Sequence, residues 1–179
     1  LPGLGAANPA YIKTLPEAIS RAASLAAAAP AEAEFGCGIE AVEPIGYNRR
    51  NRDFAEIDPW LKAGVFRLKG RKIYLLNYAC HAVTLGPTKD ITADWLGATA
   101  AALEQAGHQA LVFQGFCGDI DPVCYLNRRL GATAEDHRLG AAILASRALK
   151  AEAGMTFVAA PGLRSVEKRV RLPLQVFPK

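Results

Sequence analysis

The stretch KIYLLNYACHAVTLGP, residues 72–87, begins like a buried strand and ends in a loop. The apolar run from Ile73 to Leu76 is typical of a strand inside a sheet. Cys80 and His81 follow this strand, and the loop then ends at Gly86-Pro87. A histidine placed where a core strand ends is therefore the first candidate functional residue of the sequence.

The residues on both sides of this strand predict a hairpin and then a strand–helix–strand unit. The segment AGVFRLKGRKIYLLNYAC, residues 63–80, has the pattern of a β-hairpin with Gly70 in its turn. The segment DWLGATAAALEQAG, residues 94–107, predicts a helix with Asp94 as its N-cap. The segment HQALVFQGF, residues 108–116, predicts a second buried strand, parallel to the first and reached by a right-handed crossover.

The N-terminal segment NPAYIKTLPEAISRAASLAAAA, residues 8–29, predicts a helix capped by Asn8. Pro16 is unfavourable inside a helix, so the alternative is a short first turn followed by a second helix capped by Thr14. The other predicted elements are an extended segment over residues 34–48, a helix over 133–154 with a Thr133–Asp136 capping box, and one or two strands over 156–174. Residues 1–179 are therefore predicted to form a single α/β layered domain with a mixed, partly parallel β-sheet flanked by helices.

The bulk composition excludes several classes of protein. The chain has 179 residues, 51% of them hydrophobic, which is enough for a domain with a real core. A net charge of +4 with scattered basic residues does not predict nucleic-acid binding. No apolar run is long enough to span a membrane. The four cysteines contain no CxxC pair and indicate neither a disulfide framework nor a compartment.

Both ends of the chain look interrupted. Leu1 starts a Gly/Pro-rich segment without a methionine, and Lys179 closely follows a predicted strand. We therefore expect the chain to be an internal part of a longer protein.

Polar residues follow both strands of the predicted parallel pair. His81 ends the first strand, Asp94 begins the intervening helix, and Asp119 and Asp121 follow the second strand. Ligands of open α/β sheets gather beyond the carboxyl ends of parallel strands, so these four residues are expected at one edge. Imidazole and carboxylate side chains together are typical of a zinc or an acid–base site.

The same residues also have purely structural explanations. His81 can satisfy loop carbonyls, Asp94 can serve only as a helix cap, and Asp119 and Asp121 can stabilise turns. Cys117 could also pair with His81 as a thiol and imidazole. His137 and Arg138 near a helix start are expected to face solvent, and His108 is expected in a loop.

The segment GYNRRNRD, residues 46–53, offers a different kind of candidate. Asn48 and Arg49 can bind a polar group of a substrate, since a guanidinium presents several donors in a fixed fork. The alternative is a loop held by ion pairs to nearby carboxylates.

Several strings, in this order, resemble the catalytic domain of the neutral/alkaline ceramidase family. They are GYNRR, NYACHAVTLGP, ITADWLGATAAALE and VFQGFCGDIDP, with a weaker echo in RVRLPL. The family consists of zinc-dependent amidases that cleave the N-acyl bond of ceramide. The resemblance implies that His81 is a zinc ligand and that Arg49 lies at the substrate. Asp94 and Asp119 would then support the site through hydrogen bonds around it, and Arg49 and Asp119 are predicted to be catalytic residues.

The chain also departs from the family pattern. The family's other zinc ligands are a histidine in an upstream His-Thr-His stretch, a glutamate and a tyrosine, and none is identifiable here. The remainder of the parent polypeptide would be needed to complete the site. Gly115 stands where the family has a serine that is implicated in catalysis, so the chain resembles ceramidase-like bacterial relatives more closely.

The sequence therefore predicts part of a zinc-dependent hydrolase acting on a small-molecule or lipid-like amide, or on a related carbonyl bond. Two alternatives remain. One is a non-catalytic binding or scaffold domain, which the glycine at position 115 suggests. The other is a thiol hydrolase built on Cys117 and His81.

Overall fold

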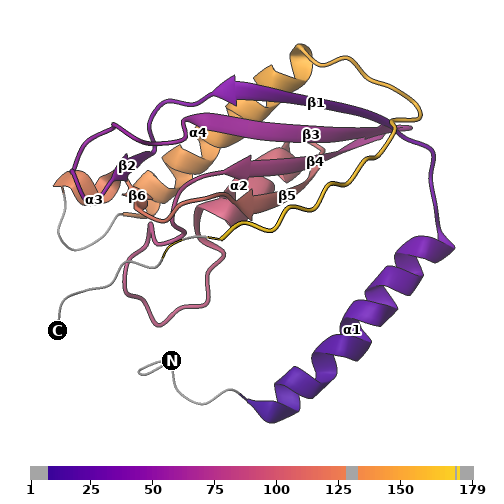
Figure 1. Cartoon of the computed structure of the whole chain (residues 1–179), viewed down its shortest axis with the longest axis horizontal. Coiled ribbons are helices and arrows are strands. Elements are labelled where there is room, and N and C mark those ends of the chain that lie inside the picture. Colours follow the sequence, from indigo (N-terminus) through magenta and orange to yellow (C-terminus); the bar gives the residue numbers. More distant parts are fainter. Residues whose placement is uncertain (1–7, 128–132, 172, 174–179) are drawn as a thin grey trace.

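The computed structural model describes residues 8–127, 133–171 and 173, and a four-stranded sheet forms its centre (Figure 1). Strands β3 (Trp60–Leu68) and β4 (Arg71–Tyr78) form the predicted hairpin, and Gly70 takes a positive φ of 76° in its turn. Strand β5 (Gln109–Gln114) runs parallel to β4, and β1 (Glu34–Ala41) pairs antiparallel with β3. The order β1-β3-β4-β5 confirms a mixed, partly parallel sheet.

Helices α2 (Asp94–Gln105) and α4 (Ala134–Ala153) cover one face of this sheet and contact each other (Figure 1). Alternate residues of β3 and β4 point into that layer, as the twofold side-chain period of a strand requires. The largest fully buried side chains are Leu61, Val65, Tyr74, Leu76, Tyr78, Trp95, Leu103 and Leu144. The α/β layered fold is therefore confirmed, with its core between the sheet and these two helices.

The predicted capping box of α4 is confirmed. The Thr133 hydroxyl accepts the Asp136 backbone N–H, and the Asp136 carboxylate accepts the Thr133 backbone N–H at 2.9 Å. Two helix-end donors are thereby satisfied reciprocally.

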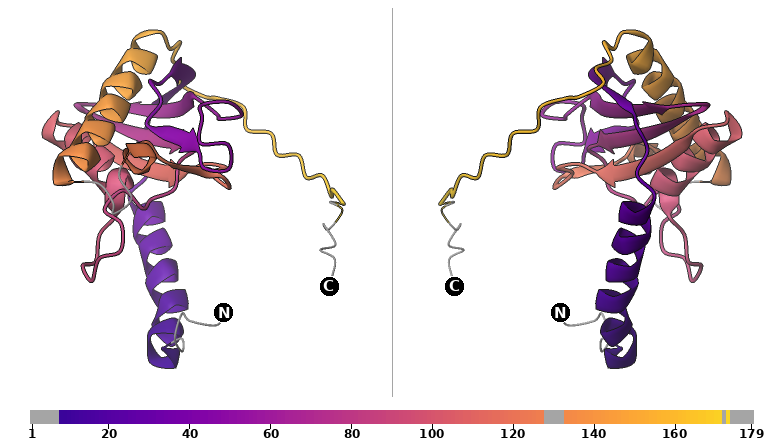
Figure 2. Two further views of the ribbon diagram at one scale, coloured as in Figure 1. Left: turned by 90° about the vertical axis from the view of Figure 1, so that its left-hand side faces the viewer. Right: turned by 90° about the vertical axis from the view of Figure 1, so that its right-hand side faces the viewer.

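Helix α1 (Pro9–Ala28) is one continuous helix, so the alternative with Thr14 as a second cap is wrong. The Asn8 side chain accepts the backbone N–H groups of Ala10 and Tyr11, as predicted. The Thr14 hydroxyl instead donates to the Tyr11 carbonyl within the helix. No residue of α1 is buried, and Figure 2 shows the helix projecting away from the sheet.

The prediction that Asp94 is the N-cap of α2 is wrong. The cap position falls on Ala93, and Asp94 lies in the first turn with an unusual positive φ of 49°. Its carboxylate accepts the backbone N–H of Trp95 at 2.7 Å and that of Leu85 at 3.3 Å. Asp94 therefore ties the preceding loop to the start of the helix.

The prediction of strands over residues 156–174 is also wrong for the described part of that segment. Its only regular pairing there is an isolated bridge between Val158 and Phe35. The alternation of the sequence finds no sheet edge to pair with after Pro161, which lacks a backbone donor. Residues 172 and 174 of the predicted strand lie outside the described residues.

A second, two-stranded sheet lies beside the main one. Strand β2 (Gly46–Asn48) pairs antiparallel with β6 (Ile120–Pro122), and the one-turn helix α3 (Cys124–Asn127) follows. This short ladder brings the Asn-Arg segment to the loop after β5.

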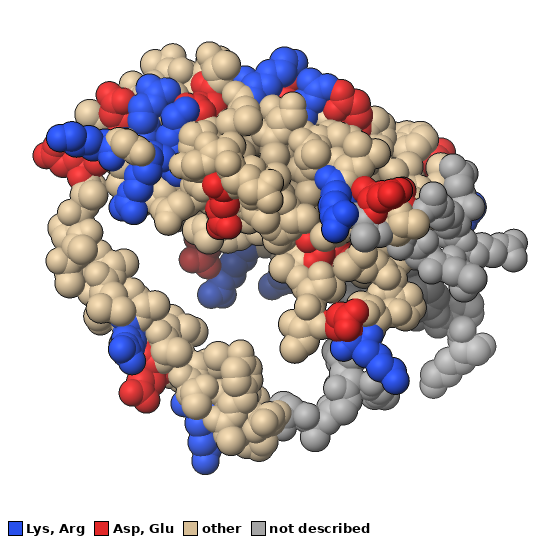
Figure 3. Space-filling model, turned by 180° about the vertical axis from the view of Figure 1, so that it is seen from behind, with Lys and Arg blue, Asp and Glu red and all other residues tan. Residues whose placement is uncertain are grey.

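Among the described residues, no helix has the length and hydropathy needed to cross a bilayer. Figure 3 shows positive and negative side chains interspersed over the face that it draws.

Candidate functional site

The candidate site lies where the parallel strands β4 and β5 end side by side. Tyr78 and Gln114 are register partners, and the Gly115 N–H donates to the Tyr78 carbonyl at 2.8 Å. The Gln114 side-chain amide donates to the Cys80 carbonyl at 3.0 Å, and the His81 N–H donates to the Ile120 carbonyl at 2.9 Å. These bonds fix the backbone of both loops before any functional side chain is considered.

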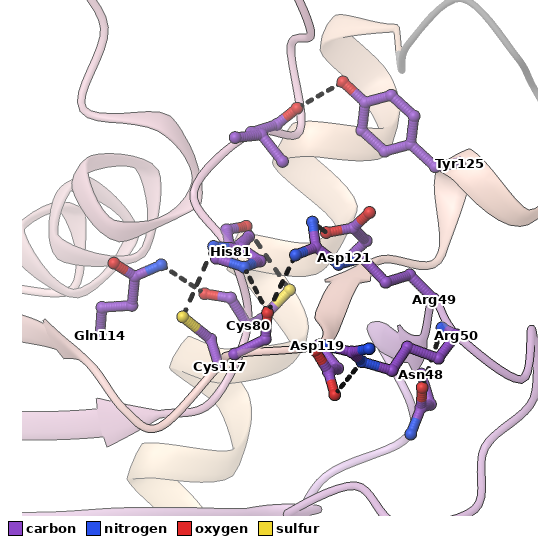
Figure 4. A network of polar contacts seen from close by, with 12 residues as sticks. Asn48, Arg49, Arg50, Cys80, His81, Gln114, Cys117, Asp119, Asp121 and Tyr125 are labelled. Atoms are coloured by element: carbon purple, nitrogen blue, oxygen red, sulfur yellow. Dashed lines mark hydrogen bonds and ion pairs between the residues drawn. The ribbon is translucent and has the colours of Figure 1, made fainter. Parts of the chain in front are cut away.

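The His81 ring is held between backbone and thiol (Figure 4). Its Nε2 lies 3.1 Å from the Gly118 carbonyl oxygen, and its Nδ1 lies 3.5 Å from Cys117 Sγ. A carbonyl oxygen only accepts, so the proton of a neutral ring belongs on Nε2. The Nδ1 lone pair then faces the thiol.

The β2–β6 ladder places Arg49 and Arg50 beside the same loop (Figure 4). Arg49 donates to the Gly118 carbonyl at 3.2 Å and lies 3.5 Å from Asp121 Oδ1. Arg50 Nε lies 2.7 Å from Asp119 Oδ2. The loop is therefore held by ion pairs to carboxylates, and Arg49 and His81 meet at one carbonyl oxygen.

Asn48 is buried, with 4% of its surface exposed, and its side chain accepts the Arg50 backbone N–H at 3.0 Å. It shapes the turn that presents the two arginines. The structure thus brings Asn48, Arg49, His81 and Asp119 together around the loop.

Asp94 is linked to the site through its neighbour Trp95. The indole N–H of its neighbour Trp95 donates to the His81 carbonyl at 3.1 Å. The His81 ring contacts Gly118 and Cys117, and Asp94 and Asp119 act on it through their neighbours.

An apolar cavity of about 210 Å³ lies beside the site, between α4, the loop that carries Cys80 and the end of β6 at Pro122. Burial, reinforced by Asp121 and Asp94, raises the pKa of the Cys80 thiol. Burial, reinforced by Asp136, raises the pKa of Cys124 to about 11. Both thiols are therefore neutral at pH 7.

The other two histidines, His108 and His137, do not contact the His81 ring. His137 lines this cavity and is half-buried, which corrects the prediction that it faces solvent. His108 lies in a loop, as predicted, and its ring packs on Tyr74 with centroids 5.4 Å apart.

Gly115 permits no side chain without rearrangement. A Cβ at this position would lie 3.0 Å from Asn77 Oδ1 and 3.2 Å from backbone atoms of Tyr78 and Ala79. The glycine at the position of the family's serine therefore allows the close approach of β4 and the loop after β5.

Gly115→Ser is expected to lower the free energy of unfolding by about 1–2 kcal/mol, because the added atoms overpack a rigid strand end. Urea denaturation would measure this loss. Gly118→Ser is the matched control, since no atom lies within 4 Å of a Cβ there. Equal stability of the two variants would contradict the packing argument.

A zinc site in a protein needs three or four donor side chains. No group of three His, Cys, Asp or Glu side chains in residues 8–127 and 133–171 could hold a metal ion. His81 nevertheless has the arrangement of a ligand, with one ring nitrogen bound to a carbonyl and the other facing a thiol. His81 thus fits one ligand position of a zinc site.

Sequence reasoning missed the Gly118 carbonyl, the Trp95 indole and the Gln114 amide. A backbone carbonyl has no signature in a single sequence. The position of Gln114 at the end of a strand beside the site was the one signal available for it.

The described fold and site define a mixed α/β domain with polar groups at its parallel strand ends. No protein-family model matches the chain, and no curated protein sequence matches it. Among solved structures, the chain is similar to the neutral ceramidase from Pseudomonas aeruginosa, with a TM-score of 0.64 and 16% identity. The match covers 77% of this chain and 25% of that one.

A ceramidase complexed with C2 is also similar, with a TM-score of 0.53 and 14% identity over 68% of this chain and 22% of that one. At these identities the likeness establishes the fold, which the chain shares with part of each of these ceramidases. The chain spans about a quarter of the length of these neighbours.

Proposed function

We propose that the chain is part of a zinc-dependent hydrolase, similar to the ceramidases, that cleaves an amide or a related carbonyl bond. The observation that carries the proposal is the convergence of the His81 ring and the Arg49 guanidinium on the Gly118 carbonyl oxygen. This convergence lies beyond the carboxyl ends of β4 and β5, where α/β folds bind their ligands. The remainder of the parent polypeptide would supply the other zinc ligands.

In this proposal, His81 would hold the zinc, and Cys117 would lie beside its ring without being a ligand. Zinc, when bound, polarises a carbonyl and activates water. The Gly118 carbonyl keeps the His81 ring in one orientation. Arg49 has 48% of its side chain exposed, so part of its guanidinium is free to orient a polar group of the substrate.

Asp119, Asn48 and Asp94 would act as positioning residues. Asp119 holds Arg50, and Asn48 fixes the turn that carries Arg49. Asp94 anchors the start of α2, from which Trp95 holds the His81 backbone.

The surface beside the site supports a lipid-like substrate. Phe116, in the loop that carries Cys117 and Gly118, is fully exposed, and Val83 is 45% exposed. Apolar side chains exposed next to polar groups favour an amide that carries an aliphatic chain.

Zinc content of the full-length parent protein tests the proposal. His81→Ala is expected to lower the zinc bound per chain, measured by elemental analysis after dialysis, to less than half of the parent value. His108→Ala is the control, because this ring packs on Tyr74 away from the site. Unchanged zinc in His81→Ala would contradict the proposal and favour a non-catalytic binding domain.

A second candidate function is a thiol hydrolase, which the 3.5 Å contact between Cys117 Sγ and His81 Nδ1 supports. An imidazole within reach of a thiol can accept its proton and leave a nucleophilic thiolate. Cys117 is half-buried and is therefore reachable from solvent.

A further inference from the structure

Helix α1 has a fully amphipathic sequence but buries none of its residues. Its larger apolar residues lie on one side at helical spacing, together with Ala22, and they are Tyr11, Ile12, Leu15, Ile19 and Leu25. The opposite side carries Lys13, Glu17, Ser20, Arg21 and Ser24. Ile19 is 67% exposed and Leu25 is 64% exposed.

A helix of this kind needs a surface to pack on. Isolated helices are marginal in water, and most helical stability in proteins comes from burial of an apolar face. Pro16 weakens α1 further, because it removes one internal hydrogen bond. An apolar surface of matching size is therefore expected near α1.

The second face of the main sheet is such a surface. Helices α2 and α4 cover one face, and the alternate residues of each strand point to the other. On that open face Ile39, Leu111 and Phe113 are 61%, 56% and 52% exposed. A hollow of about 510 Å³ lies there over Gly64, with Cys37 among its lining residues. Parallel strand pairs such as β4–β5 are normally covered on both faces.

The dimensions of the helix and the sheet agree. Helix α1 has 20 residues, which is about 30 Å, and β1 has 8 residues, which is about 26 Å. They are joined by residues 29–33, a usual length for a helix-to-strand loop. Figures 1 and 2 show α1 attached to the body through this loop at the start of β1.

We propose that α1 docks on the open face of its own sheet, antiparallel to β1, with Ile19 and its apolar neighbours toward the hollow over Gly64. Docking produces three layers, helix–sheet–helix, over β1 and β3 and the hollow at Gly64. It covers the open face where the apolar lining residues gather.

Cys37 reports this docking, because it is exposed and lines the open face when α1 stands away. In the 179-residue chain, alkylation of Cys37 by iodoacetamide, followed by peptide mass spectrometry, is expected to be slow. Ile19→Asp is expected to raise the labelling rate at least about tenfold, because a carboxylate cannot be buried against the sheet. Ser20→Asp, on the polar side of α1, is the matched control and should leave the rate unchanged.

Disulfide crosslinking identifies which segment covers the open face of the sheet, independently of the labelling of Cys37. Ala22→Cys is expected to form a bond with Cys37 within one chain on mild oxidation, whereas Ser24→Cys on the polar side is not. Links between two chains would overturn the proposal in favour of a second copy as the occupant. Rapid labelling of Cys37 in the parent chain, or protection that Ile19→Asp leaves intact, would also overturn it.

Discussion

His81→Ala in the full-length parent protein is expected to lower kcat/KM for hydrolysis of an acyl amide by about a thousandfold. This corresponds to about 4 kcal/mol of transition-state stabilisation, within the several kcal/mol that a metal supplies through Lewis-acid polarisation. Cys117→Ser separates the two candidate mechanisms. If zinc carries the chemistry, the serine variant is expected to keep activity within about tenfold, the scale of losing one supporting contact at a metal site.

Two reagents check the same distinction without mutation. A chelator is expected to abolish the activity of the parent protein, and added zinc should restore it. Iodoacetamide, which blocks Cys117, is expected to have the smaller effect. Indifference to chelators, together with rapid loss on alkylation and inactivity of Cys117→Ser, would replace the zinc mechanism by the thiol mechanism.

Glu152→Gln is expected to lower the free energy of unfolding by about 2–3 kcal/mol at pH 7. Glu152 is 8% exposed, and it accepts hydrogen bonds from Lys72 at 3.0 Å, from Arg67 at 3.3 Å and from the Tyr74 hydroxyl. Removing one member of a buried ionic cluster typically costs about 3–5 kcal/mol. We expect the smaller loss of about 2–3 kcal/mol because Lys72 and Arg67 are partly exposed to solvent, which screens their charges.

The effect depends on pH in a defined direction. Burial alone would raise the pKa of Glu152, but hydrogen bonds from Lys72 and Tyr74 lower it below the ordinary value of 4.5. The cluster therefore stabilises the fold fully above pH 4.5, and its contribution is lost as the pH falls through the lowered pKa.

Urea denaturation measures the free energy of unfolding of the parent and of Glu152→Gln at pH 7 and pH 3.5. The difference between the two proteins is expected to be smaller at pH 3.5. Glu104→Gln, at an exposed position of α2, is the control and should change stability by less than about 0.5 kcal/mol. A difference in the free energy of unfolding that does not change with pH would contradict the proposed role of the Glu152 carboxylate.

Part of the site was predictable because its signals are local. The run before His81 and the alternation around Gly70 specified a hairpin, and two apolar strands around a helix specified a parallel pair. Together they predicted that His81 and Asp119 approach one edge. The contact of the His81 ring with Cys117 was among the predicted alternatives. Its contact with the Gly118 carbonyl was not predictable, because a backbone carbonyl has no signature in a single sequence.

The errors have physical causes as well. Aspartate is a common N-cap residue. The Asp94 carboxylate, however, accepts the backbone N–H of Leu85 in the preceding loop, and the cap position falls on Ala93. The apolar and polar residues after Val158 alternate as in a strand. In the described part of this segment, however, they pair with no strand beyond the bridge of Val158 to Phe35. Pro16 suggested a break, yet a single missing donor in a long helix does not end it.

By itself, the sequence determined the β3–β4 hairpin, strand β5, helices α2 and α4 and the layered α/β class, because periodicity and turn glycines act over a few neighbouring residues. Only the tertiary structure decided that Asn48 and Arg49 meet the loop of Gly118 and Asp119. The β2–β6 ladder that joins them has three residues on each strand, separated by more than seventy positions along the chain. Such a pairing is stabilised by packing and by the arginine–carboxylate contacts across it, and it leaves no periodic pattern in either segment.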